Sequence, residues 1–246
     1  MHLFGLIGYP IQHSRSPLLF QKIFEREDRT DCSYQLFPLT SINKLPLLLQ
    51  NEPDLSGFNV THPYKESILP YLDELSDEAR IIGAVNTVSV QRNNTKFQLT
   101  GYNTDCEGFR MLLQSEVTPL TGRALILGTG GAAKAVAFVL QQLNIPFTFV
   151  SRTPKTGMIS YQQITPEIIK QNKLIINATP VGMISTTPTL PSLPYNALTP
   201  HHLLIDLIYN PPKTAFLNEG IQRGARCLNG TIMLEGQAEA SWEKWR

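Results

Sequence analysis

The sequence has few cysteines, no long apolar run and almost no net charge, and each shortage excludes a class of protein. Its 246 residues include only 3 cysteines, and an odd number of distant cysteines is a poor disulfide framework. The apolar run at 135–140 is too short to span a bilayer. With 21 Lys+Arg against 20 Asp+Glu and no basic block, binding to nucleic-acid phosphates is disfavoured. We therefore expect a cytoplasmic protein that binds neither nucleic acid nor membrane.

Two further absences narrow the class. The first five residues lack the positive charge of a signal peptide, and Pro10 interrupts the short apolar stretch that follows. No CxxC motif is present and no His-rich segment suggests a structural metal, so we expect no metal site. Near-zero net charge does not decide between a monomer and a homodimer.

What the chain does contain is an alternation of short apolar strands and helices. This alternation predicts an α/β fold with a largely parallel sheet and a domain switch near residues 104–120. Ser16 before Pro17 predicts the N-cap of a helix, and Asn93-Asn94 predicts a hairpin turn. The expected strands are 3–8, 33–38, 57–60, 85–91, 96–100, 124–127, 147–150, 174–177, 203–207 and 226–228, and the expected helices are 16–27, 42–50, 104–113, 132–140, 215–223 and 232–245.

A glycine-rich turn at 128–133 follows one of these strands and opens a helix. This is the arrangement of dinucleotide-binding sites: Gly128 allows the tight turn and Gly130 lets the backbone approach a pyrophosphate. Ala133 keeps the helix close to the sheet, and free N–H groups at the helix N-terminus favour an anion. A plain connecting turn is the alternative for a single match of this kind.

The end of the next strand indicates which dinucleotide would bind. An NAD enzyme places an acidic residue there, whereas this strand ends in Ser151-Arg152-Thr153-Pro154-Lys155. Arg152 and Lys155 are suited to a 2′-phosphate, and Thr153 can donate a hydrogen bond. We therefore expect NADP(H) as the cofactor; a solvated basic turn is the alternative.

Polar side chains also gather near predicted strand ends in the first half of the chain. They lie at 13–17, 59–65, 86–87 and 101–105. In open α/β sheets, ligands bind outside the carboxyl ends of the strands. Each residue alone has an ordinary structural explanation, so only their joint placement indicates a site.

Together these segments carry a resemblance to the shikimate dehydrogenase family. The shared motifs are Ser-x-Ser-Pro at 14–17, Asn-Val-Thr-x-Pro-x-Lys at 59–65, Gly-Ala-Val-Asn-Thr at 83–87, Gly-x-Asn-Thr-Asp-x-x-Gly at 101–108, the turn at 128–133, Asn-Ala-Thr-Pro-x-Gly-Met at 177–183, Asp-x-x-Tyr-x-Pro at 206–211 and Gly-x-x-Met-Leu-x-x-Gln-Ala at 230–238. They extend over almost the whole chain in order, which is far more specific than one motif.

The resemblance implies a fold and an activity. The fold would be an N-terminal α/β substrate domain (1–104, completed by the C-terminal helix 232–246) and a Rossmann-type NADP-binding domain (105–231), with the active site in the cleft between the domains. The activity would be the NADP-dependent, reversible reduction of 3-dehydroshikimate to shikimate, a step of aromatic amino acid biosynthesis.

The resemblance also implies roles for particular residues. Lys65 and Asp105 would be the catalytic pair. The substrate would be bound by Ser14, Ser16, Thr61, Asn86, Tyr209 and Gln237. Together with Ser151 and Lys155 of the basic turn, the residues expected to meet the cofactor are Gly128, Thr129, Gly130, Gly131, Ala132, Arg152, Thr153, Thr179, Gly230 and Met233.

The chain departs from the family pattern in two ways. Ser151 stands where the family usually has Asn, and only a short segment separates Ser151 from Asn177. Pro154, Gly157 and Pro166 interrupt that segment, so the helix that normally follows the basic turn is expected to be reduced to a loop. We expect the choice of NADP to persist with weaker binding.

The chemistry of a ketone reduction is consistent with the proposed pair. Hydride transfer places negative charge on oxygen, which needs a proton donor or a cation nearby. Lys65 suits either role, and the sequence leaves open whether it carries the proton or mainly orients substrate and stabilises charge. Two alternatives remain: a quinate/shikimate dehydrogenase with relaxed selectivity, and a catalytically silent nucleotide-binding or redox-sensing protein. Retention of Ser14, Ser16, Lys65 and Asp105 argues against both.

Overall fold

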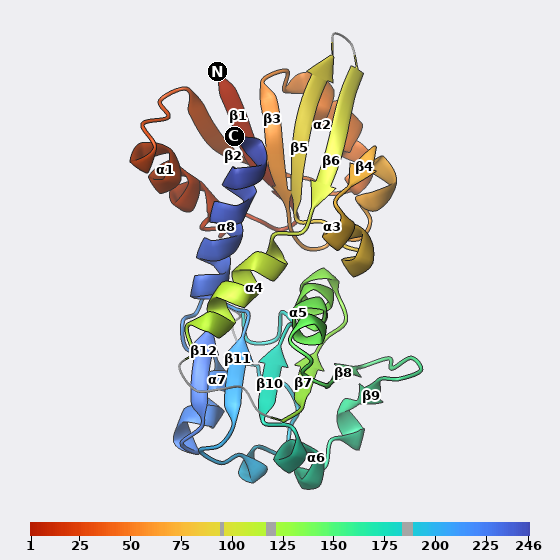
Figure 1. Ribbon diagram of the computed structural model, residues 1–246, viewed down its shortest axis with the longest axis vertical. Helices are drawn as coiled ribbons and strands as arrows, with labels where there is room; N and C mark the ends of the chain where they lie inside the picture. Colours follow the sequence, from red (N-terminus) through yellow and green to blue (C-terminus); the bar gives the residue numbers. More distant parts are fainter. Residues whose placement is uncertain (94–95, 117–121, 184–188) are drawn as a thin grey trace. The chain divides into compact units, whose positions relative to one another are not determined.

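The computed structural model describes residues 1–93, 96–116, 122–183 and 189–246. The chain divides into two compact units, of which unit 1 comprises residues 1–108 and 235–246 and unit 2 comprises residues 109–234. Each unit contains one six-stranded sheet, and the strands of both can be followed in Figure 1.

Unit 1 is built on a mixed sheet in the order β2-β1-β3-β5-β6-β4. Its elements are β1 (His2–Gly8), α1 (Ser16–Arg26), β2 (Cys32–Pro38), η1 (Ile42–Lys44), α2 (Leu45–Asn51), β3 (Leu55–Val60), η2 (Leu69–Tyr71), β4 (Glu74–Leu75), α3 (Asp77–Ile82), β5 (Thr87–Asn93) and β6 (Lys96–Tyr102). Two helices cross the boundary along the chain: α4 (Asp105–Gln114) begins in unit 1 and ends in unit 2, and α8 (Thr231–Trp245) begins in unit 2 and ends in unit 1. The expectation of a largely parallel sheet is confirmed here, because β1, β2, β3, β4 and β6 run in one direction and β5 alone among these strands pairs antiparallel with its neighbours. The turn predicted at Asn93-Asn94 lies partly outside the described residues.

Two apolar clusters stabilise unit 1. The larger includes Leu45, Phe58, Ile68 and Val88, all fully or almost fully buried. The second joins α1 and β1 to the C-terminal helix through Phe4, Phe20 and Trp242. Trp245 packs flat against Phe4 and lies where a side chain on Gly57 would collide with it. The last turns of α8 are therefore part of the core of unit 1.

Unit 2 has a fully parallel sheet in the order β12-β11-β10-β7-β8-β9. Its elements are β7 (Ala124–Leu127), α5 (Gly131–Gln142), β8 (Phe147–Ser151), β9 (Ile159–Ser160), η3 (Tyr161–Gln163), α6 (Pro166–Gln171), β10 (Leu174–Asn177), η4 (Tyr195–Ala197), β11 (Leu203–Asp206), α7 (Ala215–Gln222) and β12 (Arg226–Asn229). Counted from β7, this is the 3-2-1-4-5-6 order of dinucleotide-binding sheets. β7 and β10 are buried along their whole length, as strands covered on both faces must be.

Two local expectations met different outcomes. Ser16 is the first helical residue of α1 and Arg15 occupies the N-cap position, so the prediction of Ser16 as N-cap is wrong. Between β8 and α6 the chain forms β9 and η3, and the described residues of this segment hold no long helix, which confirms that the helix after the basic turn is reduced.

Among the described residues, none of the helices combines the length and the apolar character needed to cross a membrane.

Candidate active site

The polar segments of unit 1 meet at one edge of its sheet. β1 and β3 run parallel, so their carboxyl ends lie at the same edge. Because β5 is antiparallel to its neighbours, the start of β5 lies there too, with Thr87 paired to Asn59 on one side and to Tyr102 on the other. The carboxyl ends of β1, β2, β3, β4 and β6 thus lie at this edge, together with the beginning of β5.

Lys65 and Asp105 form an ion pair at this edge. The Lys65 Nζ donates to Asp105 Oδ2 at 2.5 Å. The side chains are 18% and 6% exposed, respectively. Lys65 follows β3, whereas Asp105 begins α4, where the positive end of the helix dipole favours a carboxylate. Tertiary folding therefore brings together two side chains that lie 40 residues apart.

Asn86 holds the other oxygen of the carboxylate. Its Nδ2 donates to Asp105 Oδ1 at 3.0 Å, while its Oδ1 accepts the backbone N–H of Thr104 at 2.6 Å. This second bond fixes which end of the amide faces Asp105. Asn86 Nδ2 also lies 3.4 Å from Gln237 Oε1 on α8. Four of the residues implied by the resemblance (Lys65, Asp105, Asn86 and Gln237) are thus connected.

A buried group of hydroxyls lies behind Asn86. The hydroxyl oxygens of Thr87, Thr104 and Ser241 lie 2.8–3.1 Å from one another. Asn59 Nδ2 donates to Ser241 Oγ at 2.9 Å. All four side chains are almost completely inaccessible to solvent, so these bonds form in a low-dielectric setting where each is stronger than in water.

The two serines before α1 contact each other. Ser14 Oγ donates to Ser16 Oγ at 3.1 Å and also accepts the backbone N–H of Ser16 at 3.2 Å. Thr61 follows β3, and its backbone N–H donates to Ile7 O at 3.0 Å. This bond fixes the backbone of the loop that leads to Lys65.

In unit 2 the glycine turn lies at the point where the strand order reverses. Gly128 follows β7 with a φ of +105°, and a Cβ there would lie 3.0 Å from both Ala178 O and the Thr179 side chain, beyond β10. Glycine is required for both reasons. Gly130 is the N-cap of α5, and a Cβ there would meet no atom within 4 Å among the described residues. Thr129, Gly131 and Ala132 complete a partly exposed rim around this helix N-terminus.

The basic turn after β8 faces solvent. Arg152, Thr153 and Lys155 are exposed, and the backbone N–H of Thr153 donates to Ser151 Oγ at 3.2 Å. Arg152 lies near Tyr161 and favours its ionised form, although burial dominates and raises the pKa of Tyr161. The cationic side chains of this turn are therefore accessible to a ligand.

A buried carboxylate organises the loops after β10 and β11. Asp206 accepts from Thr214 Oγ1 at 2.6 Å, from Asn177 Nδ2 at 3.0 Å and from the backbone N–H of Ile208 at 3.1 Å. Asn177 in turn accepts from the hydroxyl of Thr179 at 2.6 Å. The same network thus fixes Thr179 and the loop that carries Tyr209.

Gly230 and Met233 lie where β12 gives way to α8. The backbone N–H of Gly230 donates to Ile208 O at 3.1 Å, and any Cβ on Gly230 would collide with the carbonyl of Leu207. Met233 is buried in the first turns of α8. Only glycine fits where these two backbone segments meet.

The comparisons with known proteins agree on one family. Residues 6–88 match the sequence model described as the shikimate dehydrogenase substrate binding domain. A shikimate dehydrogenase (NADP(+)) of Desulforamulus reducens is 35% identical over 269 residues, covering 98% of this chain and 88% of the relative. One from Shouchella clausii is 36% identical over 259 residues, covering 98% and 92%. The chain belongs to the shikimate dehydrogenase family.

Solved structures of the family share the fold. The crystal structure of shikimate 5-dehydrogenase from Thermus thermophilus, in complex with NADP(H) and shikimate, superposes with a TM-score of 0.87 at 34% identity, covering 100% of this chain and 93% of that one. The two-part α/β architecture with a Rossmann-type sheet, which the resemblance implies, is thereby confirmed.

The sequence analysis did not identify several residues of the polar network around Asn86. Tyr34, Asn59, Thr104 and Ser241 make buried or partly buried hydrogen bonds around Asn86. Asn59 and Thr104 lie within shared motifs, which is a signal that could have found them. Ser241 is a polar residue on the apolar face of the last helix, and this contrast is also a signal that could have found it. For Tyr34 the sequence offers no such sign.

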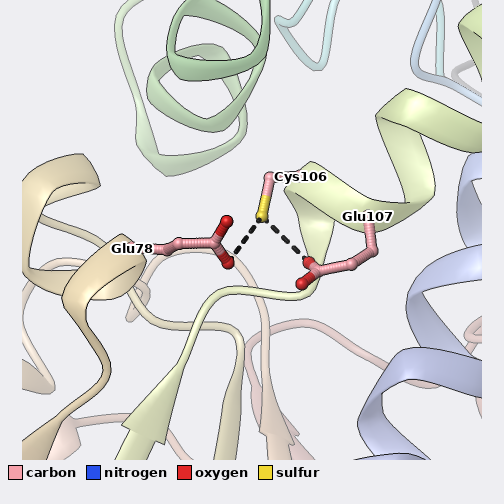
Figure 2. A group of neighbouring side chains, drawn as sticks. All are labelled: Glu78, Cys106 and Glu107. Atoms are coloured by element: carbon pink, nitrogen blue, oxygen red, sulfur yellow. Dashed lines mark hydrogen bonds between the residues drawn. The ribbon is translucent and has the colours of Figure 1, made fainter. Parts of the chain in front are cut away.

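A second cluster lies beside Asp105. Figure 2 shows Glu78 and Glu107 on either side of the Cys106 thiol. The thiol lies 2.9 Å from Glu107 Oε2 and 2.8 Å from Asn103 O, with Glu78 Oε2 at 3.8 Å. The three side chains offer atoms within 4.8 Å of one another that could hold a metal ion. Acidic side chains often lie close together without a metal ion, so this closeness alone assigns no metal site.

Asp206 provides a prediction about stability and pH. Burial raises the pKa of Asp206 from its usual 3.8 to about 6. The folded protein therefore binds this proton more tightly than the unfolded chain, so stability should fall by roughly 2–3 kcal/mol as pH rises from about 4 to above 6. Asp206→Asn removes this titrating group. The melting temperature of the variant should therefore rise relative to that of the wild type as pH increases over the same range. Thermal unfolding at several pH values, with exposed Asp54→Asn as control, tests this; parallel wild-type and Asp206→Asn curves would contradict it.

Proposed function

We propose that this protein catalyses the NADP-dependent, reversible reduction of 3-dehydroshikimate to shikimate, a step of aromatic amino acid biosynthesis. The observation that carries the proposal is the Lys65–Asp105 pair, held by Asn86 at the edge of the unit 1 sheet. The names of the relatives and the ligands of the Thermus thermophilus structure support the same reaction.

Lys65 and Asp105 are the catalytic pair in this proposal. When bound, NADPH supplies the hydride for the ring ketone carbon. The Lys65 ammonium stabilises the negative charge that develops on the ketone oxygen and is placed to give it a proton. Asp105 orients the ammonium, and Asn86 keeps the carboxylate in place. In the reverse direction the same nitrogen accepts the proton of the shikimate hydroxyl.

The polar side chains of the site suit a substrate rich in hydroxyls. We assign substrate binding to Ser14, Ser16, Thr61, Asn86, Tyr209 and Gln237, with residues 1–104 and the C-terminal helix as the substrate domain. A site built of hydrogen-bonding groups rejects ligands that leave those groups unpaired. Quinate, with an additional ring hydroxyl, is the competing substrate to test.

The residues of unit 2 fit NADP(H). Gly130 leaves open space at the N-terminus of α5, where backbone N–H groups favour a pyrophosphate. We assign cofactor binding to residues 105–231, with Gly128, Thr129, Gly130, Gly131 and Ala132 at the pyrophosphate, Ser151, Arg152, Thr153 and Lys155 at the 2′-phosphate side, and Thr179, Gly230 and Met233 nearby.

The choice of cofactor gives a direct prediction. Arg152→Ala should raise the KM for NADP+ about tenfold or more, since one charge-assisted hydrogen bond contributes on the order of 1.5–3 kcal/mol. The KM for NAD+, which lacks the 2′-phosphate, should change little. Steady-state kinetics with both cofactors measure this, with exposed Lys170→Ala as the control. An unchanged KM for NADP+ would show that Arg152 does not meet the phosphate.

The assay that tests the proposed function follows NADP+ reduction by absorbance with shikimate and with quinate, and repeats both with NAD+. We expect turnover with shikimate and NADP+ to exceed every other pair. Comparable rates with quinate would indicate the relaxed enzyme, and turnover with none of the pairs would refute the proposal.

A further inference from the structure

Tyr34 connects two parts of the candidate site that the sequence keeps apart. It lies in the middle of β2, an outer strand of the unit 1 sheet, and its hydroxyl donates to Asn59 Oδ1 at 2.8 Å. The Ser16 hydroxyl lies beside the same oxygen, where it favours the ionised phenol although burial opposes this. The Tyr34 hydroxyl therefore lies between the start of α1 and the end of β3.

The direction of these bonds follows from the donors available. Ser14 Oγ donates its proton to Ser16 Oγ at 3.1 Å. The Ser16 proton is then free to be donated to Tyr34, whose own proton goes to Asn59, because a carbonyl-type oxygen can only accept. Burial raises the pKa of Tyr34 well above its usual value, so the phenol remains a donor at every working pH.

The bond to Asn59 fixes the rest of the buried network. With its oxygen bonded to Tyr34, the Asn59 amide directs its Nδ2 toward Asn86 O, Thr87 Oγ1 and Ser241 Oγ, at 3.1, 3.1 and 2.9 Å. Thr87 and Thr104 hydroxyls contact Asn86, which donates to Asp105. Removing the phenol hydroxyl would leave a buried acceptor on Asn59 without its donor.

The ring of Tyr34 is held independently of its hydroxyl. It stacks on Phe20, with ring centroids 4.3 Å apart and planes 5° from parallel. Its ring centroid also lies 6.5 Å from that of Trp245. Loss of the oxygen alone should therefore leave the ring where it is.

We propose that Tyr34 is a positioning residue for the polyhydroxylated substrate. Its hydroxyl fixes the position of the Ser14/Ser16 loop relative to the Asn59–Asn86–Asp105 network, so that both can bind one substrate ring at once. This inference rests on the proposed function and adds to it a residue outside the substrate and cofactor contacts assigned above.

Tyr34→Phe tests the inference with the loss of one atom. We expect the KM for shikimate to rise about five- to tenfold, as for a lost hydrogen bond at a binding site. The kcat should change less than about twofold, because Lys65 and Asp105 keep their direct contact. The KM for NADP+ should stay close to the wild-type value, while the unpaired Asn59 oxygen should lower the melting temperature of the free enzyme by a few degrees.

The matched control is Tyr71→Phe. Tyr71 also donates its hydroxyl to an asparagine oxygen of unit 1, Asn43 Oδ1, at 2.7 Å. This variant should keep wild-type kinetics. An equal rise in the shikimate KM of both variants would overturn the assignment, since the effect would then belong to tyrosine hydroxyls in general.

A double-mutant cycle tests whether Tyr34 affects shikimate binding through Ser16. If Tyr34 acts through Ser16, the effects of Ser16→Ala and Tyr34→Phe on the shikimate KM should be clearly less than multiplicative in the double variant. Shikimate should also raise the melting temperature of Tyr34→Phe less than that of the wild type. An active wild type with a kinetically identical Tyr34→Phe variant would overturn this inference alone, whereas a wild type without shikimate turnover would overturn the proposed function as well.

Discussion

Replacing Lys65 with alanine should lower kcat by a factor of roughly 10² to 10⁴, the usual contribution of a positioned proton donor. The ammonium is the cation that Asp105 and Asn86 hold at the site edge, and without it the negative charge on the ketone oxygen would go unstabilised. The KM for shikimate should change far less, because hydroxyls and amides supply most of the proposed substrate contacts. Steady-state kinetics with shikimate and NADP+ measure both constants.

Two companion variants sharpen this experiment. Exposed Lys22→Ala in unit 1 removes a lysine without touching the site and should behave as wild type. Lys65→Arg keeps a positive charge that does not release its proton at working pH. Activity recovered by arginine would assign Lys65 an electrostatic role, and no recovery would assign it proton transfer. A Lys65→Ala variant with near-wild-type kcat would refute the catalytic pair.

Valine at Gly130 should raise the KM for NADP+ on the order of a hundredfold, since it would obstruct several backbone hydrogen bonds to the pyrophosphate. The fold should tolerate the change. Gly130 has an extended backbone conformation, φ −78° and ψ −177°, and an added Cβ meets no described atom within 4 Å. The new side chain would therefore point into the space proposed for the cofactor rather than into the protein.

This prediction is checked by cofactor titration together with thermal unfolding. A melting temperature close to that of the wild type, with weak NADP+ binding, would support the assignment of the turn. Unchanged NADP+ affinity in the folded variant would show that the cofactor lies elsewhere. The KM for shikimate, measured at saturating NADP+, is the internal control.

The elements that sequence reasoning predicted well are those whose signals are local. The glycine turn between β7 and α5 and the strand that ends at the basic turn could be read from short patterns, because turn geometry and strand burial restrict residue types nearby. The loss of a helix after Lys155 followed from Pro154, Gly157 and Pro166 in the same way. The hairpin predicted at Asn93-Asn94 also implied that β5 and β6 are antiparallel, whereas hydrophobic alternation does not reveal that β5 pairs antiparallel with β3 as well.

The residues of the candidate site also differ in whether the sequence identified them. Motif resemblance identified Lys65, Asp105, Asn86 and Gln237, and the structure connects them. It did not identify the hydroxyl network, because Tyr34, Asn59 and Ser241 come from β2, β3 and α8 and have meaning only where those elements meet. The assignment of Ser16 as a helix cap failed for a related reason, since α1 begins at Ser16 itself and its hydroxyl accepts a hydrogen bond from Ser14.

The resemblance of the motifs to a family indicated Lys65 and Asp105 as the catalytic pair. By itself the sequence determined the glycine turn that follows a strand and opens a helix, and the basic residues that follow the next strand. These are properties of residue type and short spacing, which local sterics and charge control. Only the tertiary structure decided that Asn86 and Lys65 hold the two oxygens of one carboxylate, and that the Tyr34 hydroxyl bonds to Asn59 in the network behind them. Hydrogen bonds depend on distances of a few tenths of an ångström, and those distances are set by the packing of strands and helices that are distant in the chain.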